Sequence, residues 1–203
     1  MEIVSSSFKG LASMKRILIV LLVSLLSACT AMPPHNIDNL CATFKEKDDW
    51  YEETQHSYQK WGVPIPVQMA IMHQESHFIA DARPDRVWLL GFIPWFRPSS
   101  AYGYAQALDA TWQDYLERTG SWTADRDDFG DASDFIGWYC AVSHNQLGIA
   151  KEDAKNLYLA YHEGNKGYKH KTYLNKLGLT RTAEKVGNRA RLFKGQLEGC
   201  KIN

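Results

Sequence analysis

The chain has 203 residues, of which 45% are hydrophobic and 23% charged, and its 23 basic and 23 acidic residues cancel to a formal net charge of zero. This composition is typical of a globular protein and excludes a disordered or fibrous one, and the balanced charge argues against a nucleic-acid partner. The length predicts a single domain with a substantial hydrophobic core.

The N-terminal region contains a short apolar run behind two basic residues. Residues 17–26 read ILIVLLVSLL and follow Lys15 and Arg16. A helix of this length reaches only about 15 Å, too little for a hydrocarbon core of about 30 Å. The pattern predicts a cleaved secretory signal rather than a membrane-spanning helix. Met14, directly before the basic pair, is a second candidate for the start of translation.

The next segment, LSAC at residues 26–29, resembles the lipobox of bacterial lipoproteins. In that family the chain is cut before the cysteine, which is then acylated, and several acyl chains anchor a protein stably. The resemblance implies a signal peptide over residues 1–28, lipidation of Cys29 and a tether over residues 29–36. Because residue 30 is not Asp, it also implies a periplasm-facing outer-membrane lipoprotein of a Gram-negative bacterium. A plain cleaved signal is the alternative.

Three cysteines remain once Cys29 is acylated, and three different single disulfides are then possible in an oxidising compartment. Cys41 and Cys200 lie on the apolar stripes of the expected first and last helices, so both face inward near chain ends that often lie close together. Cys140 lies in an almost wholly apolar segment, as a small buried hydrophobe would. We therefore predict a Cys41–Cys200 disulfide.

Apolar residues recur at spacings of three and four, which predicts a mainly α-helical domain over residues 37–203. Helices are expected at residues 37–60, 66–78, 135–147, 151–163 and 180–198, and between a cap at Asp109 and Gly120. The first helix would hold on one face Ile37, Phe44, Tyr51 and Tyr58. Gly164 would end the helix at 151–163, and residues 131–134 would open the one at 135–147. Pro and Gly punctuate residues 83–99, which predicts a loop or small hairpin there.

The expected helix 66–78 contains one acid, Glu75, and no Lys or Arg occurs between Lys60 and Arg83. Its apolar residues lie on both sides, so the helix should be buried nearly all round. Desolvation without a neighbouring cation raises a carboxyl pKa, which suits a general acid near neutral pH. A buried or half-exposed Glu with a structural role is the alternative.

His73 and His77 share a helix face, as the two histidines of a zinc site do. In the zincin pattern the general base directly follows the first histidine. Glu75 instead lies two positions after His73, about 200° around the helix. We therefore expect no metal and no cofactor.

Three segments now line up with a known family. HQESHF at residues 73–78 resembles the Glu-Ser-x-Phe motif of the soluble lytic transglycosylase (SLT) catalytic domain, in glycoside hydrolase family 23. AYGYAQA at 101–107 is similar to its Gly-Leu-Met-Gln segment, and AYHEG at 160–164 resembles its Ala-Tyr-Asn-x-Gly. The resemblance covers about residues 45–175 and implies a lysozyme-like fold of the goose-type and SLT kind.

By this resemblance peptidoglycan glycan strands are the substrate and Glu75 is the catalytic residue. Glu75 would protonate the glycosidic oxygen between N-acetylmuramic acid and N-acetylglucosamine. It would then act as base on the muramyl 6-hydroxyl, which attacks C1 and leaves a 1,6-anhydro end. Such chemistry needs no second carboxylate, unlike the two-carboxylate scheme of most glycosidases.

The resemblance also implies which residues surround the substrate. Gln106 and the backbone of residues 103–105 would hold the N-acetylated sugar, and Tyr161 would hydrogen-bond and orient Glu75. Ser76 would support helix packing or the sugar site. The implied substrate-binding and orienting residues are Ser76, Gly103, Tyr104, Ala105, Gln106, Tyr161 and His162.

The chain departs from the family pattern at several positions. Tyr104 and Ala105 replace Leu-Met and so reshape a subsite wall, and His162 replaces Asn as an altered partner near the site. We interpret Glu163 as a solvated acid rather than a catalytic one. The insertion at 83–99 carries aromatic residues that could stack on sugar, touch a membrane or, as we favour, pack: Trp88, Phe92, Trp95 and Phe96.

Two alternatives remain open. A goose-type muramidase would share the fold and Glu75 but admit water to C1, and a non-catalytic lipoprotein would only bind the cell wall. Charge is also distributed unevenly: residues 107–163 hold 11 acids and 4 bases, whereas residues 164–203 hold 10 bases and 2 acids. We infer that the basic C-terminal part lies against anionic peptidoglycan.

Overall fold

The computed structural model describes residues 32–91 and 93–202, so the signal peptide, the site of lipidation at Cys29 and the candidate start at Met14 lie outside the described residues. The described part is mainly helical, as predicted. Its helices are α2 (Leu40–Glu46), α3 (Trp50–Trp61), α4 (Ile65–Ser76), α5 (Asp109–Thr119), α6 (Phe129–Leu147), α7 (Ala154–Lys169), the 3-10 helix η1 (Thr172–Asn175) and α8 (Leu177–Glu198). Two short strands, β1 (Trp88–Leu89) and β2 (Ile93–Pro94), complete these elements.

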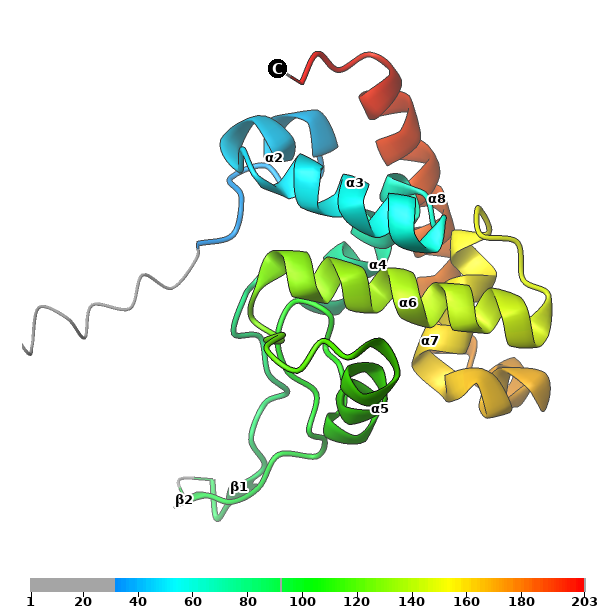
Figure 1. Ribbon diagram of the computed structural model, residues 1–203. Helices are drawn as coiled ribbons and strands as arrows, with labels where there is room; N and C mark the ends of the chain where they lie inside the picture. Colours follow the sequence, from blue (N-terminus) through cyan, green and yellow to red (C-terminus); the bar gives the residue numbers. More distant parts are fainter. Residues whose placement is uncertain (1–31, 92, 203) are drawn as a thin grey trace, which may run out of the picture. The chain divides into compact units, whose positions relative to one another are not determined.

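Helix α4 lies at the centre of the helical packing. It contacts α3, α6, α7 and α8, and α6 also packs against α3 and α7 (Figure 1). Every residue of α4 is buried except Pro66, Gln74 and Glu75. The prediction that this helix is buried nearly all round is therefore confirmed, and Glu75 is one of the few positions where it reaches the surface.

Polar and aromatic contacts fix the neighbours of α4. The buried Gln68 side chain donates to the Val63 carbonyl at 2.8 Å and accepts from the Ser133 hydroxyl of α6 at 2.8 Å. The rings of Trp50 and Phe129 stack with centroids 3.8 Å apart, which joins the starts of α3 and α6. Such satisfied polar groups and stacked rings hold α3, α4 and α6 in one arrangement.

Several helix boundaries differ from those expected. The helix expected over 37–60 is two helices, because Asn39 caps α2 by accepting from the Ala42 N–H and residues 47–49 separate α2 from α3. Tyr58, expected on the inner face, is 42% exposed. Pro66 lies within the first turn of α4, which begins one residue earlier than predicted and ends two residues earlier.

Local caps explain the other differences. Asp128, rather than residues 131–134, opens α6 by accepting from the Asp131 N–H. Asp109 is the first residue of α5 instead of its cap, and its N–H donates to the Ser100 hydroxyl at 3.1 Å. Gly120 ends α5 in a left-handed conformation, as predicted. Helix α8 begins three residues before the predicted position, after η1, which the sequence pattern did not reveal.

The two ends of the domain are joined by the predicted disulfide. Cys41 and Cys200 are bonded with their Cα atoms 5.6 Å apart. The Gln196 side chain of α8 supports this junction, since it accepts from the Leu40 N–H at 2.8 Å and donates to the Asp38 carbonyl at 3.0 Å. Cys140 is a buried free thiol, whose pKa burial raises to about 12.

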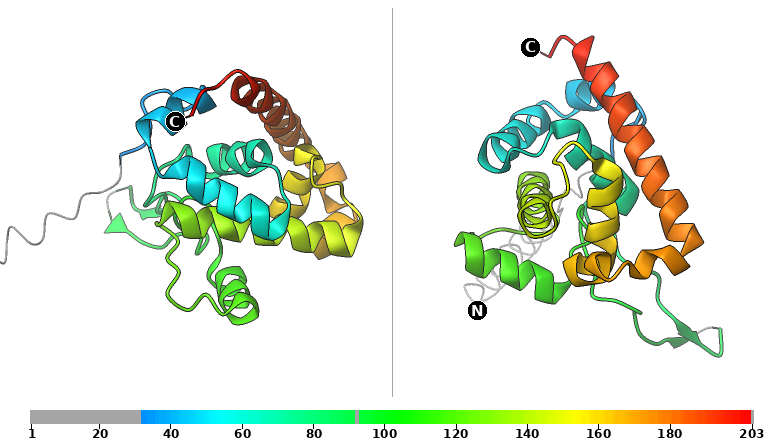
Figure 2. Two further views of the ribbon diagram at one scale, coloured as in Figure 1. Left: turned by 45° about the horizontal axis from the view of Figure 1, so that its top comes forward. Right: turned by 90° about the vertical axis from the view of Figure 1, so that its right-hand side faces the viewer.

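Residues 83–99 form the small hairpin that was one of the two forms expected. Strands β1 and β2 pair antiparallel, with Trp88 opposite Pro94, and the hairpin extends away from the helices (Figures 1 and 2). Trp95 and Phe96 are 61% and 52% exposed, so the expected packing of these aromatic side chains is wrong for both. In residues 32–91 and 93–202, no helix combines the length and hydropathy that crossing a membrane requires.

The described part of the expected tether, residues 32–36, lies along α2. The His35 N–H and ring Nδ1 lie 3.0 and 2.9 Å from the Glu46 carboxylate, and Lys47 donates to the Met32 carbonyl at 2.8 Å. Pro34 is buried. Residues 32–36 are therefore held on the domain rather than extended away from it.

Candidate active site

Glu75 lies in the last turn of α4, where the chain leaves the helix through a sharp turn. The next residues after Ser76 are His77 and Phe78, which both have positive φ values, 53° and 61°. Phe78 is fully buried and anchors the turn in the core, whereas His77 is exposed. Most of the helix is thus buried in the interior, and Glu75, near its end, is half-buried.

The surroundings of Glu75 favour its protonated form. Burial raises its pKa to about 7, and the hydrogen bond from Tyr158 acts in the opposite direction. No charged side chain of the described residues contributes to this shift. The rise of the Glu75 pKa was predicted from the absence of Lys and Arg near this residue, and its cause is desolvation.

Two tyrosines of α7 reach this region, but their roles differ from the expected one. The Tyr158 hydroxyl forms the hydrogen bond with Glu75, whereas the Tyr161 hydroxyl donates to the Ala105 carbonyl at 2.6 Å. The prediction that Tyr161 hydrogen-bonds Glu75 is therefore wrong. The charge of Glu75 contributes to the raised pKa of Tyr161, so Tyr161 still lies near the carboxyl.

Sequence reasoning missed Tyr158 as a site residue. Tyr158 and Tyr161 are three positions apart on one face of α7, and both belong to its inward apolar stripe. This spacing brings both side chains to the same region. Only the packing of α7 decides which hydroxyl meets the carboxyl.

The turn at residues 101–107 is positioned against α7 by Tyr161 and is closed by its own hydrogen bonds. The Gln106 amide donates to the Ala82 carbonyl at 2.8 Å and to the Gly103 carbonyl at 2.9 Å. Gly103 has a φ of 79°, and a Cβ there would meet the Arg126 carbonyl oxygen at 1.9 Å. Glycine is thus required at 103 by both its conformation and its close backbone contact.

Three of the expected substrate-binding side chains are core residues. Tyr104 is 1% exposed and packs edge-on against Trp50, and Ala105 is fully buried. Their side chains cannot form a subsite wall, so that expectation is corrected, although their backbone lies in the turn. Ser76 is also buried, and its hydroxyl donates to the Met72 carbonyl at 3.3 Å, which favours the packing role.

Glu163 is held in an ion pair rather than solvated. Its side chain is 4% exposed and accepts from Lys176 at 2.7 Å and from the Thr172 hydroxyl. The Lys176 and Thr172 hydrogen bonds lower its pKa to about 2. His162 is exposed, and its Nδ1 lies 3.2 Å from the Glu163 carboxylate. The solvated interpretation of Glu163 is therefore wrong.

Gly164 redirects the chain directly after this pair. Its φ of 73° and ψ of 155° are not helical, so α7 is two helical segments meeting at a kink. The expected helix end at Gly164 is correct for the first segment, but helical structure resumes and continues to Lys169. The kink carries the chain toward η1, where Thr172 meets Glu163.

A family model described as "Transglycosylase SLT domain" matches residues 17–200 of the 203. The chain belongs to this family. As a member of this family, the chain has a lysozyme-like fold and a lytic transglycosylase activity on peptidoglycan. The three sequence motifs predicted both. No curated protein and no solved structure is similar enough to count as a match.

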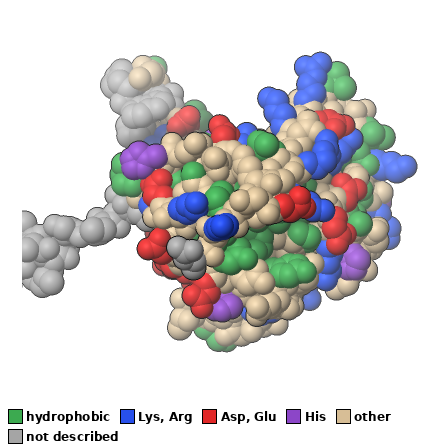
Figure 3. Space-filling view, turned by 90° about the horizontal axis from the view of Figure 1, so that it is seen from above, with side chains coloured by type: hydrophobic (Ala, Val, Ile, Leu, Met, Phe, Trp, Pro, Cys, Tyr) green, Lys and Arg blue, Asp and Glu red, His purple; other side chains and the backbone are tan. Residues whose placement is uncertain are grey.

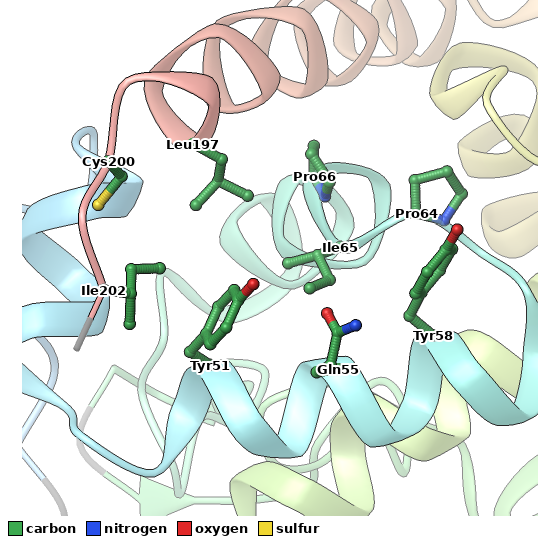
Figure 4. Close-up of a pocket in the computed structure, with 9 residues that line it drawn as sticks. All are labelled: Tyr51, Gln55, Tyr58, Pro64, Ile65, Pro66, Leu197, Cys200 and Ile202. Atoms are coloured by element: carbon green, nitrogen blue, oxygen red, sulfur yellow. The ribbon is translucent and has the colours of Figure 1, made fainter.

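A separate groove of the SLT domain lies at the other end of α4. It has a volume of about 320 Å³, and Figure 4 shows Tyr51, Gln55 and Tyr58 of α3 facing Ile65 and Pro66. These α4 residues belong to the first turn of the helix, whereas Glu75 belongs to the last, about 15 Å away. The groove is therefore distinct from the region around the Glu75 carboxyl.

The buried His73 of α4 packs among rings, whereas the exposed His77 follows the end of the helix. His73 is 4% exposed, and desolvation lowers its pKa to about 4. Its ring centroid lies 5.1 Å from that of His77 and 5.6 Å from that of Phe78. In the part of the SLT domain that the structure describes, no group of three His, Cys, Asp or Glu side chains is arranged to hold a metal ion.

Proposed function

We propose that this SLT domain cleaves the β-1,4 bond between N-acetylmuramic acid and N-acetylglucosamine with Glu75 as its only catalytic acid and base. The setting of Glu75 carries the proposal: it is a half-buried carboxyl with a pKa raised to about 7 by burial, to which no charged group of residues 32–91 and 93–202 contributes. About half of such groups are protonated at neutral pH, so Glu75 can act both as a general acid and, once ionised, as a base.

Both steps of the proposed reaction use the same carboxyl. Glu75 first gives its proton to the glycosidic oxygen, and the bond from that oxygen to C1 of the muramyl sugar breaks. The carboxylate then takes the proton of the muramyl 6-hydroxyl as its oxygen bonds to C1. Glu75 ends protonated, no water is consumed, and a 1,6-anhydro end forms. The Tyr158 hydrogen bond stabilises the carboxylate between the two steps.

The turn at residues 101–107 is proposed to hold the N-acetylated sugar. The Gln106 Nε2 group is occupied by the carbonyls of Ala82 and Gly103, which orients the side chain and leaves Oε1 to accept from the acetamido N–H. Tyr161 positions the same turn through the Ala105 carbonyl. His162, exposed beside Glu163, is proposed to border the substrate rather than to take part in proton transfer.

The proposal is tested by digesting purified peptidoglycan with the wild type and with Glu75→Gln. We expect the wild type to release muropeptides with anhydro ends, identified by mass spectrometry, and Glu75→Gln to lose at least about 10³-fold in rate. Glu117→Gln, an exposed acid on α5, is the matched control and should keep wild-type activity.

Other products would support the alternatives. Hydrated, reducing ends from the wild type would establish a muramidase of the goose type. Binding to peptidoglycan without release of product would establish a non-catalytic wall-binding protein. Equal product from the wild type and Glu75→Gln would remove the catalytic role of Glu75.

We further propose that Cys29 carries the lipid anchor that holds the enzyme at the periplasmic face of the outer membrane. The support is the sequence alone: basic residues 15–16, the apolar run 17–26 and the LSAC segment that ends at Cys29. Growth with labelled palmitate should label the wild type in the outer-membrane fraction. Cys29→Ala should be unlabelled and soluble, and its retention in that fraction would contradict the proposal.

A further inference from the structure

A cavity of about 310 Å³ opens where the hairpin joins the turn at residues 101–107. Its lining includes three arginines, Arg83, Arg97 and Arg126, around Tyr102, and we name these four residues the arginine pocket. The one acid in the lining is Asp109. The lining therefore has an excess of positive charge.

The guanidinium groups of the arginine pocket are held in place by Tyr102. Arg83 lies 4.1 Å and Arg126 5.3 Å from the centre of the Tyr102 ring. The Tyr102 hydroxyl donates to Asp127 at 2.6 Å, which fixes the position of the ring. Stacked guanidinium groups of this kind are pre-organised donors for planar anions such as carboxylates.

The positive charge of the pocket is only partly neutralised. Arg126 forms an ion pair with Asp109 at 2.8 Å, and Asp127 lies near Arg83. Arg97 donates to the Pro84 carbonyl. Among residues 32–91 and 93–202, no acidic side chain forms an ion pair with Arg83 or Arg97. Arg83 and Arg97, two arginines in the lining of the cavity, are thus available to an anionic ligand.

Hydrogen bonds to backbone carbonyls connect the arginine pocket to the turn beside Glu75. The Ala107 carbonyl accepts from the Tyr102 N–H at 3.3 Å and from Arg126 at 3.0 Å. The Ala82 carbonyl, next to Arg83, accepts from Gln106. Tyr102 is three residues before Ala105, the partner of Tyr161, so at most about 11 Å of chain separates the pocket from the site.

We propose that the arginine pocket binds the carboxylates of the peptide stems that branch from the glycan strand, an inference that rests on the proposed function. A strand held by the turn at 101–107 presents its muramyl substituents to whatever lies beside that turn. The stems carry free carboxylates, and Arg83 and Arg97 offer the paired N–H donors that bind carboxylates in a bidentate manner. The enzyme therefore distinguishes stem-bearing from stem-free glycan.

Binding to the inactive Glu75→Gln protein tests the proposal without turnover. Two probes are titrated by calorimetry: a disaccharide tetrapeptide with free carboxylates, and the same compound with these groups converted to carboxamides. We expect the carboxylate form to bind about five- to tenfold more tightly at low salt, and this preference to shrink as salt increases. Equal binding of the two probes would overturn the proposal.

Substitutions then locate the preference. Arg83→Gln and Arg97→Gln, each added to Glu75→Gln, should reduce the preference to about twofold or less, and Arg83→Lys should retain part of it. Arg86→Gln, an exposed arginine in the same segment, is the matched control and should keep the full preference. Loss of the preference in Arg86→Gln, or its survival in both pocket variants, would overturn the proposal.

A comparison of substrates distinguishes this inference from the proposed function. In the catalytically intact protein, the ratio of kcat/KM for stem-bearing strands to that for strands stripped by an amidase should fall in Arg83→Gln and stay constant in Arg86→Gln. A wild type that prefers the carboxylate probe but releases no anhydro product would reject the proposed function alone. A wild type that releases anhydro product from both strands equally would reject the inference alone.

Discussion

Burial and a hydrogen bond from Tyr158 act in opposite directions on the pKa of Glu75. Burial raises the pKa of the carboxyl to about 7, and the Tyr158 hydrogen bond limits that rise because it stabilises the ionised form. The pKa of Tyr158 is itself raised by burial and by the charge of Glu75, so the phenol remains a hydrogen-bond donor across the working pH range. The protonation of the Glu75 carboxyl and the hydrogen bond from the Tyr158 hydroxyl are thus coupled.

Tyr158→Phe should therefore shift the pH profile of the enzyme. Without the hydroxyl the pKa of Glu75 rises further, so the fall of kcat/KM above about pH 7 should move to higher pH by about half to one unit. The rate at its optimum should fall, because the carboxylate needed in the second step loses its donor. Peptidoglycan digestion between pH 5 and pH 9 measures both effects.

Tyr161→Phe is the control for that experiment, since its hydroxyl donates to the Ala105 carbonyl instead. It should raise KM through the turn at 101–107 and leave the position of the alkaline fall unchanged. If Tyr161→Phe moved the alkaline fall while Tyr158→Phe did not, the assignment of the hydrogen bond to Tyr158 would be incorrect.

The sequence was sufficient to single out Glu75 as the candidate acid and to predict its raised pKa, but not to identify its hydrogen-bond partner. Glu75 stands out because it is an isolated carboxyl in an apolar helix without nearby cations, and these features are local. The partner depends on how α7 is rotated against α4, which the spacing of Tyr158 and Tyr161 does not reveal. The prediction that Tyr104 shapes a subsite wall was wrong for a similar reason. Its side chain is buried against Trp50, and this tertiary contact cannot be read from the sequence.

At the scale of elements, the kink at Gly164 and helix η1 depend on one buried carboxylate. Glu163 reaches Thr172 and Lys176 across the kink, so it joins the end of α7 to the start of α8. Its side chain is only 4% exposed, so the carboxylate depends on these hydrogen bonds for compensation, whereas the Lys176 side chain is 53% exposed and stays hydrated. The Glu163 carboxylate therefore acts as a structural link between elements.

Glu163→Gln should destabilise the domain by about 1–3 kcal/mol at neutral pH, measured by urea unfolding. The folded-state pKa of about 2 lies below the ordinary value of 4.5, so this stabilisation is present above about pH 4.5 and is lost as the pH falls toward 2. The difference between wild type and variant should shrink accordingly. Lys176→Gln and the double variant complete a double-mutant cycle. If the losses in the free energy of unfolding were strictly additive, Glu163 and Lys176 would not stabilise the domain through their ion pair.

Helix positions were predictable because apolar periodicity is a local property, and so were the left-handed end of α5 at Gly120 and the interruption of α7 at Gly164. The starts of α2 and α6 were not, because several Asn and Asp residues near each start can act as caps. Asn39 and Asp128 were selected by the packing of the helices they begin. The hairpin was foreseen as irregular structure, but the exposure of Trp95 and Phe96 depends on how far it extends from the helices.

At the scale of the whole domain, charge is separated along the chain. The acidic excess of residues 107–163 and the basic excess of residues 164–203 occupy successive parts of the fold. Figure 3 shows one face on which basic side chains are most numerous at the upper and right-hand edges, where acidic ones are interspersed. A cavity of about 490 Å³ between α6 and α7 is lined by Lys166, Lys169 and His170.

Lys166→Gln with Lys169→Gln should weaken sedimentation with insoluble peptidoglycan about two- to fivefold at low salt. These exposed lysines act through long-range attraction, so the difference should vanish at high salt. Lys45→Gln with Arg86→Gln removes the same charge elsewhere and should have a smaller effect. Equal losses in the two double variants would indicate dependence on net charge rather than on the C-terminal basic region.

The Cys41–Cys200 bond makes the domain a closed covalent ring, with a consequence for mechanical load. A pull on the chain before residue 41 cannot unravel α2 and α3 one after the other, because the bond passes the force directly to the end of α8. The load then bypasses α4, which carries Glu75 in the interior of the ring. The Glu75 carboxyl is thereby spared tension that passes from the N-terminal end of the domain to the end of α8.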